Sequence, residues 1–310
     1  MIVAKGLSKS YSGFSAISGV DFEIQDGEII GLLGLNGAGK STILKILGCF
    51  LMPSSGTAIV GGHRVDQNPH EIRKMIGFLP DSPPLYDEME VEAYLRYVAR
   101  LKEVPKSQIQ AAVDRVVEKT ELRDVLGARL GELSHGYRQR VSISQALVHN
   151  PKVLILDEPI NGLDPVQIVE MRDLIKSLGG HHTIVLSSHI LSEITQTCDR
   201  ILIIDQGKLV YVGDQKGLEM ASKNKSYIEV EWRNAKDACL ENLKALATVS
   251  KIDHETGDEV ISAKVYAEAD VRPDVAKAII QNGGDLLSMK KAQGDLENVF
   301  MQLVKNSHRS

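Results

Sequence analysis

The chain has few cysteines, no excess of positive charge and no long hydrophobic run. Bilayer-spanning helices need about 18–20 apolar residues, and no stretch here is that long. The N-terminus lacks the apolar core and small-residue cleavage site of a signal peptide. Cys49, Cys198 and Cys239 form neither a disulfide framework nor a metal-ligand pattern. A net charge of -5 gives no support for nucleic-acid binding. We therefore expect a cytoplasmic protein without a nucleic-acid partner, whose membrane role would depend on another chain.

The 310 residues are 43% hydrophobic and 25% charged, as in an ordinary globular protein of one or two domains. Residues 1–217 alternate short apolar runs with helical segments, which predicts an α/β domain with a largely parallel sheet. The all-apolar runs at 153–156, 183–186 and 201–204 are typical of strands covered on both faces. Residues from about 82 to 150 show only helical spacing, so we expect a helical subdomain inserted there.

The pattern changes after a polar stretch at residues 214–225, and residues 218–310 form a second predicted domain. Its apolar spacing predicts strands at 227–232, 249–254, 260–266 and 286–289 and helices at 238–246, 273–281 and 296–303. Strand–helix–hairpin–helix–strand order indicates a small ferredoxin-like α+β module. It carries no residue pattern of catalytic chemistry, and we interpret it as a docking or dimerising module.

Residues 34–41 read Gly-Leu-Asn-Gly-Ala-Gly-Lys-Ser, the G-x-x-x-x-G-K-S pattern of a phosphate-binding loop. Its glycines allow the tight backbone that points N–H groups at a polyphosphate. Lys40 can reach the terminal phosphates, and the Ser41 hydroxyl can ligate Mg²⁺. An apolar strand precedes the loop and a helix follows it, so the helix N-terminus faces the phosphates. This context predicts a nucleotide hydrolase.

Asp157 and Glu158 follow the apolar run at 153–156, at the strand end where α/β folds bind ligands. Burying a carboxylate is costly unless a cation or hydrogen bonds compensate, so two adjacent acids here indicate a metal–phosphate site. We expect Asp157 to hold Mg²⁺, through water, and Glu158 to polarise the attacking water.

Further motifs resemble those of ABC ATPases, in the order in which that family has them. Residues 133–140 read LSHGYRQR and resemble the family signature LSGGQRQR. Residues 162–164 resemble the D-loop, and residues 187–189 resemble the switch-histidine loop. Tyr11 occupies the place of an adenine-stacking aromatic. The resemblance covers residues 1 to about 215 and identifies the expected fold as a P-loop NTPase cassette with an inserted helical subdomain.

The resemblance implies an ATP-binding site and a head-to-tail homodimer of cassettes. Glu158 and His189 are the expected catalytic residues, and Asp164 belongs to the D-loop. Ser134 and Gly136 of the signature would contact the γ-phosphate of the ATP held by the other cassette, where a helix N-terminus favours an anion. The residues expected to bind ATP in the same chain are Tyr11, Gly34, Asn36, Gly37, Ala38, Gly39, Lys40, Ser41 and Thr42.

Three positions depart from the common family pattern. His135 replaces the first signature glycine and Tyr137 replaces the glutamine, and we interpret both as tolerated. Asp81 occupies the place of the Q-loop glutamine. A carboxylate there can still bind a metal-bound water, but it lacks the amide donor of glutamine and adds negative charge near phosphate.

Residues 136–140 (GYRQR) and 296–300 (LENVF) are similar to ABC-2-type exporter cassettes, in particular those associated with gliding motility. The resemblance implies the ATP-hydrolysing subunit of an exporter, peripheral on the inner face of the cell membrane and bound to separate permease subunits. One alternative is a soluble ABC ATPase acting on ribosomes or DNA; the single cassette, the lack of a long heptad run and the acidic charge disfavour it. Another is a regulatory module that holds ATP without turnover, which the presence of Glu158 and His189 disfavours.

Overall fold

The computed structural model describes residues 1–221, 227–257, 260–267, 270–292 and 299–301. The chain divides into two compact units, Met1–Gln215 and Lys216–Asn306. No described helix is both long and apolar enough to cross a membrane.

A six-stranded sheet lies at the centre of the first unit, in the order β10-β9-β3-β8-β7-β6. Its five strands from β9 to β6 are parallel, and β10 pairs antiparallel with β9. The parallel sheet predicted from the apolar runs is therefore confirmed. The strands are β3 (Ile29–Leu33), β6 (Ile76–Leu79), β7 (Val153–Leu156), β8 (Thr183–Ser188), β9 (Arg200–Asp205) and β10 (Lys208–Gly213).

A second, four-stranded antiparallel sheet, which the sequence interpretation missed, has the order β2-β1-β4-β5. Its strands are β1 (Ile2–Tyr11), β2 (Phe14–Ile24), β4 (Ser55–Val60) and β5 (His63–Arg64). Ser12 and Gly13 form the β1–β2 turn with φ of 42° and 91°, the positive angles that two-residue hairpins require. The Ser-Gly pair between two strand-forming runs was the available sequence signal.

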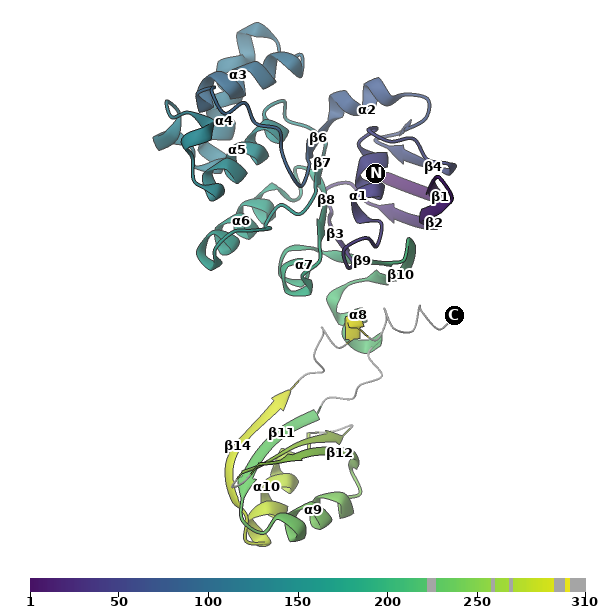
Figure 1. The fold of residues 1–310 in the computed structure, drawn as a ribbon, viewed down its shortest axis with the longest axis vertical. Coiled ribbons are helices and arrows are strands. Elements are labelled where there is room, and N and C mark those ends of the chain that lie inside the picture. Colours follow the sequence, from purple (N-terminus) through teal and green to yellow (C-terminus); the bar gives the residue numbers. More distant parts are fainter. Residues whose placement is uncertain (222–226, 258–259, 268–269, 293–298, 302–310) are drawn as a thin grey trace. The chain divides into compact units, whose positions relative to one another are not determined.

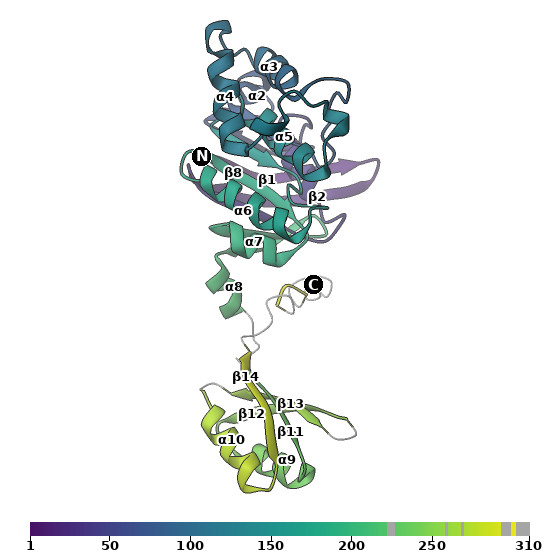
Figure 2. The ribbon, with the colours of Figure 1, turned by 90° about the vertical axis from the view of Figure 1, so that its left-hand side faces the viewer.

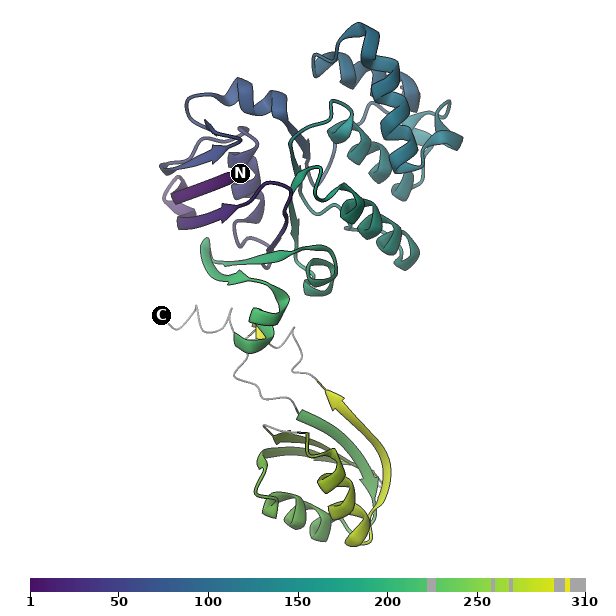
Figure 3. The ribbon, with the colours of Figure 1, turned by 180° about the vertical axis from the view of Figure 1, so that it is seen from behind.

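The helices of the first unit fall into groups around the central sheet (Figures 1 and 3). Helix α1 lies between the two sheets, and its apolar residues join the core that both sheets share. Helices α3, α4 and α5 gather on the side of the central sheet away from β1 and β2. The helices are α1 (Lys40–Leu47), α2 (Pro69–Met75), α3 (Val91–Leu101), α4 (Ile109–Thr120), α5 (His135–Leu147), α6 (Pro165–Leu178) and α7 (Leu191–Thr197), with single 3-10 turns at Lys106–Gln108, Arg123–Val125 and Leu130–Glu132.

Helix α8 (Gln215–Ala221) begins at the last residue of the first unit and continues into the second, which contains a four-stranded antiparallel sheet in the order β12-β13-β11-β14. Helices α9 and α10 pack on one face and bury Trp232 and Val265 of the sheet (Figure 2). The β-α-β-β-α-β order confirms the ferredoxin-like α+β fold. The expected final helix at 296–303 lies mostly outside the described residues. The elements are β11 (Tyr227–Arg233), α9 (Lys236–Ala245), β12 (Val249–Thr256), β13 (Ile261–Ala267), α10 (Arg272–Gln281) and β14 (Asp285–Ala292).

Candidate functional site: a nucleotide hollow at the end of the central sheet

The phosphate-loop motif connects β3 to the N-terminus of α1. Gly34 and Gly39 cannot carry a side chain there. A Cβ at Gly34 would lie 2.4 Å from the Ile204 carbonyl oxygen, and a Cβ at Gly39 would lie 2.8 Å from the Ala16 carbonyl oxygen. Gly39 also has a φ of 110°, which L side chains rarely adopt. The glycine pattern is thus required by close backbone packing around the loop.

Three backbone N–H groups of the loop have no acceptor within the described part of the chain. The N–H groups of Asn36, Gly37 and Gly39 donate no hydrogen bond there, whereas that of Ala38 donates to the Leu35 carbonyl at 3.1 Å. They lie beside the N-terminus of α1, where the helix dipole adds positive potential. Unpaired donors around a positive helix end fit a polyphosphate.

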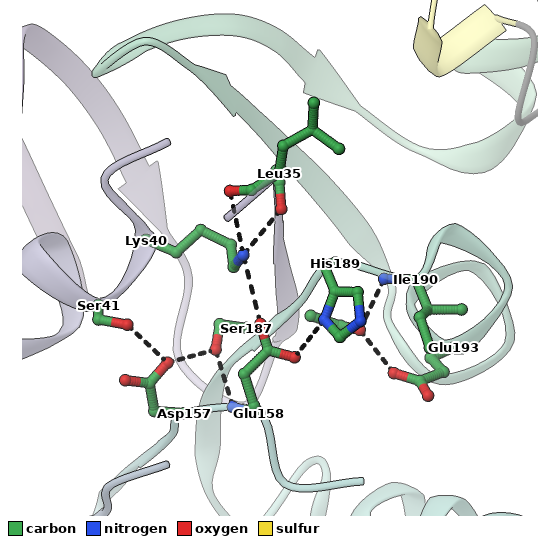
Figure 4. Close-up of polar contacts among 11 residues, drawn as sticks. Leu35, Lys40, Ser41, Asp157, Glu158, Ser187, His189, Ile190 and Glu193 are labelled. Carbon is green, nitrogen blue, oxygen red and sulfur yellow. Dashed lines mark hydrogen bonds and ion pairs between the residues drawn. The ribbon is translucent and has the colours of Figure 1, made fainter. Parts of the chain in front are cut away.

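Lys40 holds its ammonium inside the loop. Its Nζ donates to the Gly34 carbonyl at 2.7 Å and lies 3.3 Å from Oε1 of Glu158 (Figure 4). Its side chain is only 6% exposed. A buried cation with one carboxylate partner can exchange that partner for an entering phosphate without passing through an unpaired state.

Asp157 and Glu158 follow β7, which is separated from β3 by β8 in the sheet, and both carboxylates contact residues of the loop or of α1. Oδ1 of Asp157 accepts hydrogen bonds from the hydroxyls of Ser41 at 3.2 Å and Ser187 at 2.7 Å. Ser187 in turn accepts from the Glu158 N–H at 2.9 Å. Glu158 has a φ of 50°, a strained value for a side-chain-bearing residue, and such strain is common at functional sites.

His189 follows β8 and contacts Glu158 directly. Its Nδ1 lies 3.0 Å from Oε2 of Glu158, and because a carboxylate only accepts, the imidazole donates from Nδ1 (Figure 4). Glu158 therefore has Lys40 on one carboxylate oxygen and His189 on the other.

The oxygen atoms of Ser41 and Asp157 are better ligands for a hard, hydrated cation than for a soft metal. Ser41 and Asp157 place a hydroxyl and a carboxylate oxygen in hydrogen-bond contact. No group of three or more His, Cys, Asp or Glu side chains with metal-binding geometry occurs among the described residues. Mg²⁺ commonly takes one or two protein oxygens and completes its octahedron with water and substrate phosphates, so this pair is sufficient for it.

A hollow of about 570 Å³ brings these elements together. Of the residues expected to bind ATP, all except Gly34 line it, and the Gly34 carbonyl instead holds Lys40. Asp81, Glu158 and His189 also line the hollow, whereas Asp157 lies beneath Ser41 and is 2% exposed. Four lining residues were missed by the sequence interpretation: Phe14, Ala16, Leu35 and Asn161.

Two aromatic rings stand at the hollow beside the β1–β2 turn. Tyr11 and Phe14 are 44% and 66% exposed, which is unusual for large apolar surfaces. The Lys9 ammonium lies 5.3 Å from the centre of the Tyr11 ring. Phe14 could have been identified from its place across the two-residue turn from Tyr11.

The signature residues lie at a different hollow, of about 750 Å³, which they share with Asp164 and Tyr137. Ser134 caps the N-terminus of α5 and accepts from the Tyr137 N–H at 3.4 Å. A Cβ at Gly136 would lie 2.6 Å from the terminal amide of Gln167 on α6, so a larger residue there would displace that side chain. Within one chain, Ser134 and Gly136 therefore do not line the phosphate-loop hollow.

Asp164 caps α6 by accepting from the N–H groups of Val166 at 3.0 Å and Gln167 at 2.9 Å, and Pro165 begins the helix. His135 lies close to the same loop, with Nε2 3.2 Å from the Asn161 carbonyl oxygen. This contact links the signature segment to a residue that lines the nucleotide hollow.

Comparisons with known proteins agree with this geometry. A family model described as ABC transporter matches residues 17–161. A bacitracin transport ATP-binding protein of Bacillus licheniformis is 33% identical over 98% of this chain and 97% of its own length. A daunorubicin resistance ATP-binding protein of Streptomyces coeruleorubidus is 30% identical over 99% of this chain and 97% of its own. The structure of cbiO1 from Clostridium perfringens, part of the ABC transporter complex cbiONQ, matches with a TM-score of 0.66 and 30% identity over 72% of this chain and 91% of that one.

Proposed function

The chain belongs to the ABC transporter family and is a nucleotide-hydrolysing subunit, and we propose that it uses ATP and Mg²⁺ to power an exporter through a separate membrane permease. The observation that carries the proposal is the hollow beside α1, which is lined by the phosphate loop, Glu158 and His189 together. A phosphate-binding loop without an adjacent carboxylate would suit nucleotide binding alone, whereas a carboxylate beside the loop suits nucleotide hydrolysis.

In the proposed site, the loop N–H groups and Lys40 bind the phosphates, and Tyr11 stacks on adenine. The phosphates would also be contacted by the backbone of the remaining expected residues, which are Asn36, Gly37, Ala38, Gly39 and Thr42. Ser41 and Asp157 would hold Mg²⁺, which when bound neutralises charge on the β- and γ-phosphates. Asp81 would orient a water molecule at the same edge of the hollow.

Glu158 acts as the general base in this proposal. In the structure, Lys40 and His189 contact its two carboxylate oxygens. Transfer of the Lys40 ammonium to ATP frees one oxygen for the attacking water, while His189 keeps the other oxygen in place. The carboxylate then accepts a proton from water as the water oxygen attacks the γ-phosphorus, and the bond from that phosphorus to the bridging oxygen breaks, which releases ADP and phosphate.

A homodimer would complete each site. Ser134 and Gly136 lie at a hollow separate from the phosphate loop of their own chain, which supports contact with ATP held by a second copy. The Ser134 hydroxyl and the α5 N-terminus are suited to an anion, and Asp164 lines the same surface. Hydrolysis would remove the γ-phosphate between the two copies and so open the dimer.

The exporter assignment is supported by relatives named for bacitracin transport and daunorubicin resistance. The proposal includes separate permease subunits, with this chain peripheral on the cytoplasmic face of the membrane. The test is purification of the tagged chain from solubilised membranes, with or without co-expression of any multi-span membrane protein that a neighbouring gene encodes. Copurification in detergent, with ATPase activity altered by the permease, is the expected result. A chain that hydrolyses ATP but never copurifies with a membrane protein would contradict the transport role.

A further inference from the structure

A buried carboxylate lies behind the switch histidine. Glu193 is in the first turn of α7 and is 8% exposed. Its Oε2 accepts a hydrogen bond from the Ser188 hydroxyl at 2.5 Å. In the part of the chain that the structure describes, no lysine, arginine or histidine nitrogen forms an ion pair with this carboxylate.

The Ser188 hydroxyl closes a turn around His189. It accepts from the Ile190 N–H at 3.0 Å while it donates to Glu193. Ser188 and Ile190 are the two chain neighbours of His189. One hydroxyl, held by Glu193, therefore joins the backbone before the histidine to the backbone after it.

This placement is electrostatically unfavourable. Burial raises the pKa of the Glu193 carboxyl, and this outweighs the lowering by the Ser188 hydrogen bond; the charge of Glu158 raises the pKa as well, while His189 and Arg172 lower it. A first-turn acid gains little from the helix dipole, and α7 has just seven residues. Helix capping alone is thus a weak reason for a buried acid at this position.

We propose that Glu193 is a positioning residue for ATP hydrolysis, which holds the Ser188 turn and so keeps the His189 imidazole against Glu158. The inference rests on the proposed roles of Glu158 and His189. The His189 side chain is 36% exposed, and within the described residues Glu158 is its only side-chain hydrogen-bond partner. The position of the ring therefore depends on this hydrogen bond and on the backbone that carries it.

Glu193→Ala removes the acceptor and leaves the Ser188 hydroxyl, 2% exposed, without its partner. Misplacing a catalytic group by about 1 Å can cost roughly 100-fold in rate, so we expect kcat to fall about 10- to 100-fold. Glu193 does not line the nucleotide hollow, so KM for ATP should stay within about twofold of the wild-type value. Ser188→Ala should reproduce both results.

Two further variants of the full-length chain separate positioning from stability. Glu193→Gln keeps an amide oxygen for the Ser188 hydroxyl, so its kcat should lie within about threefold of wild type. Thr197→Val is the matched control, because the buried Thr197 hydroxyl donates to the Glu193 carbonyl at 2.6 Å within the same helix. It should lower Tm as Glu193→Ala does, while kcat of the folded protein remains unchanged.

A double-mutant cycle with His189→Ala decides whether Glu193 acts through the histidine. Residues that act as a unit are non-additive, so Glu193→Ala should have no further effect on kcat when His189 is absent. Equal slowing with and without His189, wild-type kcat in Glu193→Ala, or a Glu193→Gln variant as slow as Glu193→Ala would each overturn the inference while leaving the proposed function intact. Wild-type turnover in His189→Ala would instead overturn the role proposed for His189, and this inference with it.

Discussion

Replacing Glu158 by glutamine exchanges one carboxylate oxygen for an amide group and tests the general base with little change of shape. The glutamine oxygen can still accept from Lys40 or His189, which lie 3.3 Å and 3.0 Å from the carboxylate in the wild type. Fold and phosphate contacts should therefore persist. The amide cannot accept a proton from the attacking water, and the change also removes one negative charge and one of the two oxygens that face Lys40 and His189.

The expected loss is about 100- to 10,000-fold in kcat, the usual contribution of a positioned general base. That range corresponds to about 3–5 kcal/mol of activation free energy. ATP affinity should stay the same or rise, because the variant removes a negative charge beside the phosphates. Uncleaved ATP should then hold two copies together.

Three measurements on the purified chain test this prediction: phosphate release at saturating ATP and Mg²⁺, titration with a fluorescent ATP analogue, and sedimentation with and without ATP. Glu118→Gln is the matched control, since Glu118 is 72% exposed on α4 and pairs with Arg123 away from the hollow. Turnover of Glu158→Gln within a fewfold of the control would refute the reasoning, because no other carboxylate contacts both Lys40 and His189 among the described residues.

Three further outcomes are expected. Lys40→Ala should weaken ATP binding by at least about tenfold, since its buried ammonium makes charge-assisted contacts of roughly 1.5–3 kcal/mol; an unchanged dissociation constant in the fluorescence titration would argue against phosphate binding by the loop. Tyr11→Ala should raise the apparent KM for ATP while Tyr11→Phe should not, because stacking needs the ring and not the hydroxyl; equal KM values in the two variants would count against stacking. A chain ending at residue 221, which retains the buried Leu218, should keep its ATP affinity because the second unit has a core of its own. The truncation should weaken the dimer, as measured by analytical ultracentrifugation, or weaken the association with the permease, as measured by membrane pull-down. Loss of ATP binding with both assemblies intact would instead place the second unit in the catalytic core.

The phosphate loop, the acidic pair and the signature could be identified from the sequence because each is a short, contiguous motif. Their chemistry requires particular residue types at fixed spacing, such as a lysine and a hydroxyl directly after a glycine-rich turn. The same is true of the parallel strands β7, β8 and β9, whose uninterrupted apolar runs reflect burial on both faces.

The antiparallel sheet and Phe14 were missed because their evidence is spread over distant segments. β1 pairs with both β2 and β4, and only the first pairing is local in sequence. Phe14 has no motif of its own and reaches the hollow because the two-residue turn places it beside Tyr11.

The residue types needed to bind and cleave a nucleotide were determined by the sequence itself, since they occur in local motifs. Their assembly was decided by the order of strands β3, β8 and β7 in the sheet. That order places Ser41 in contact with Asp157, which is 116 positions away in the sequence, and His189 in contact with Glu158, which is 31 positions away. It also buries Glu193 behind Ser188 and leaves the signature at a separate hollow. Strand order depends on which apolar faces pack together over the whole domain, so no local spacing specifies it.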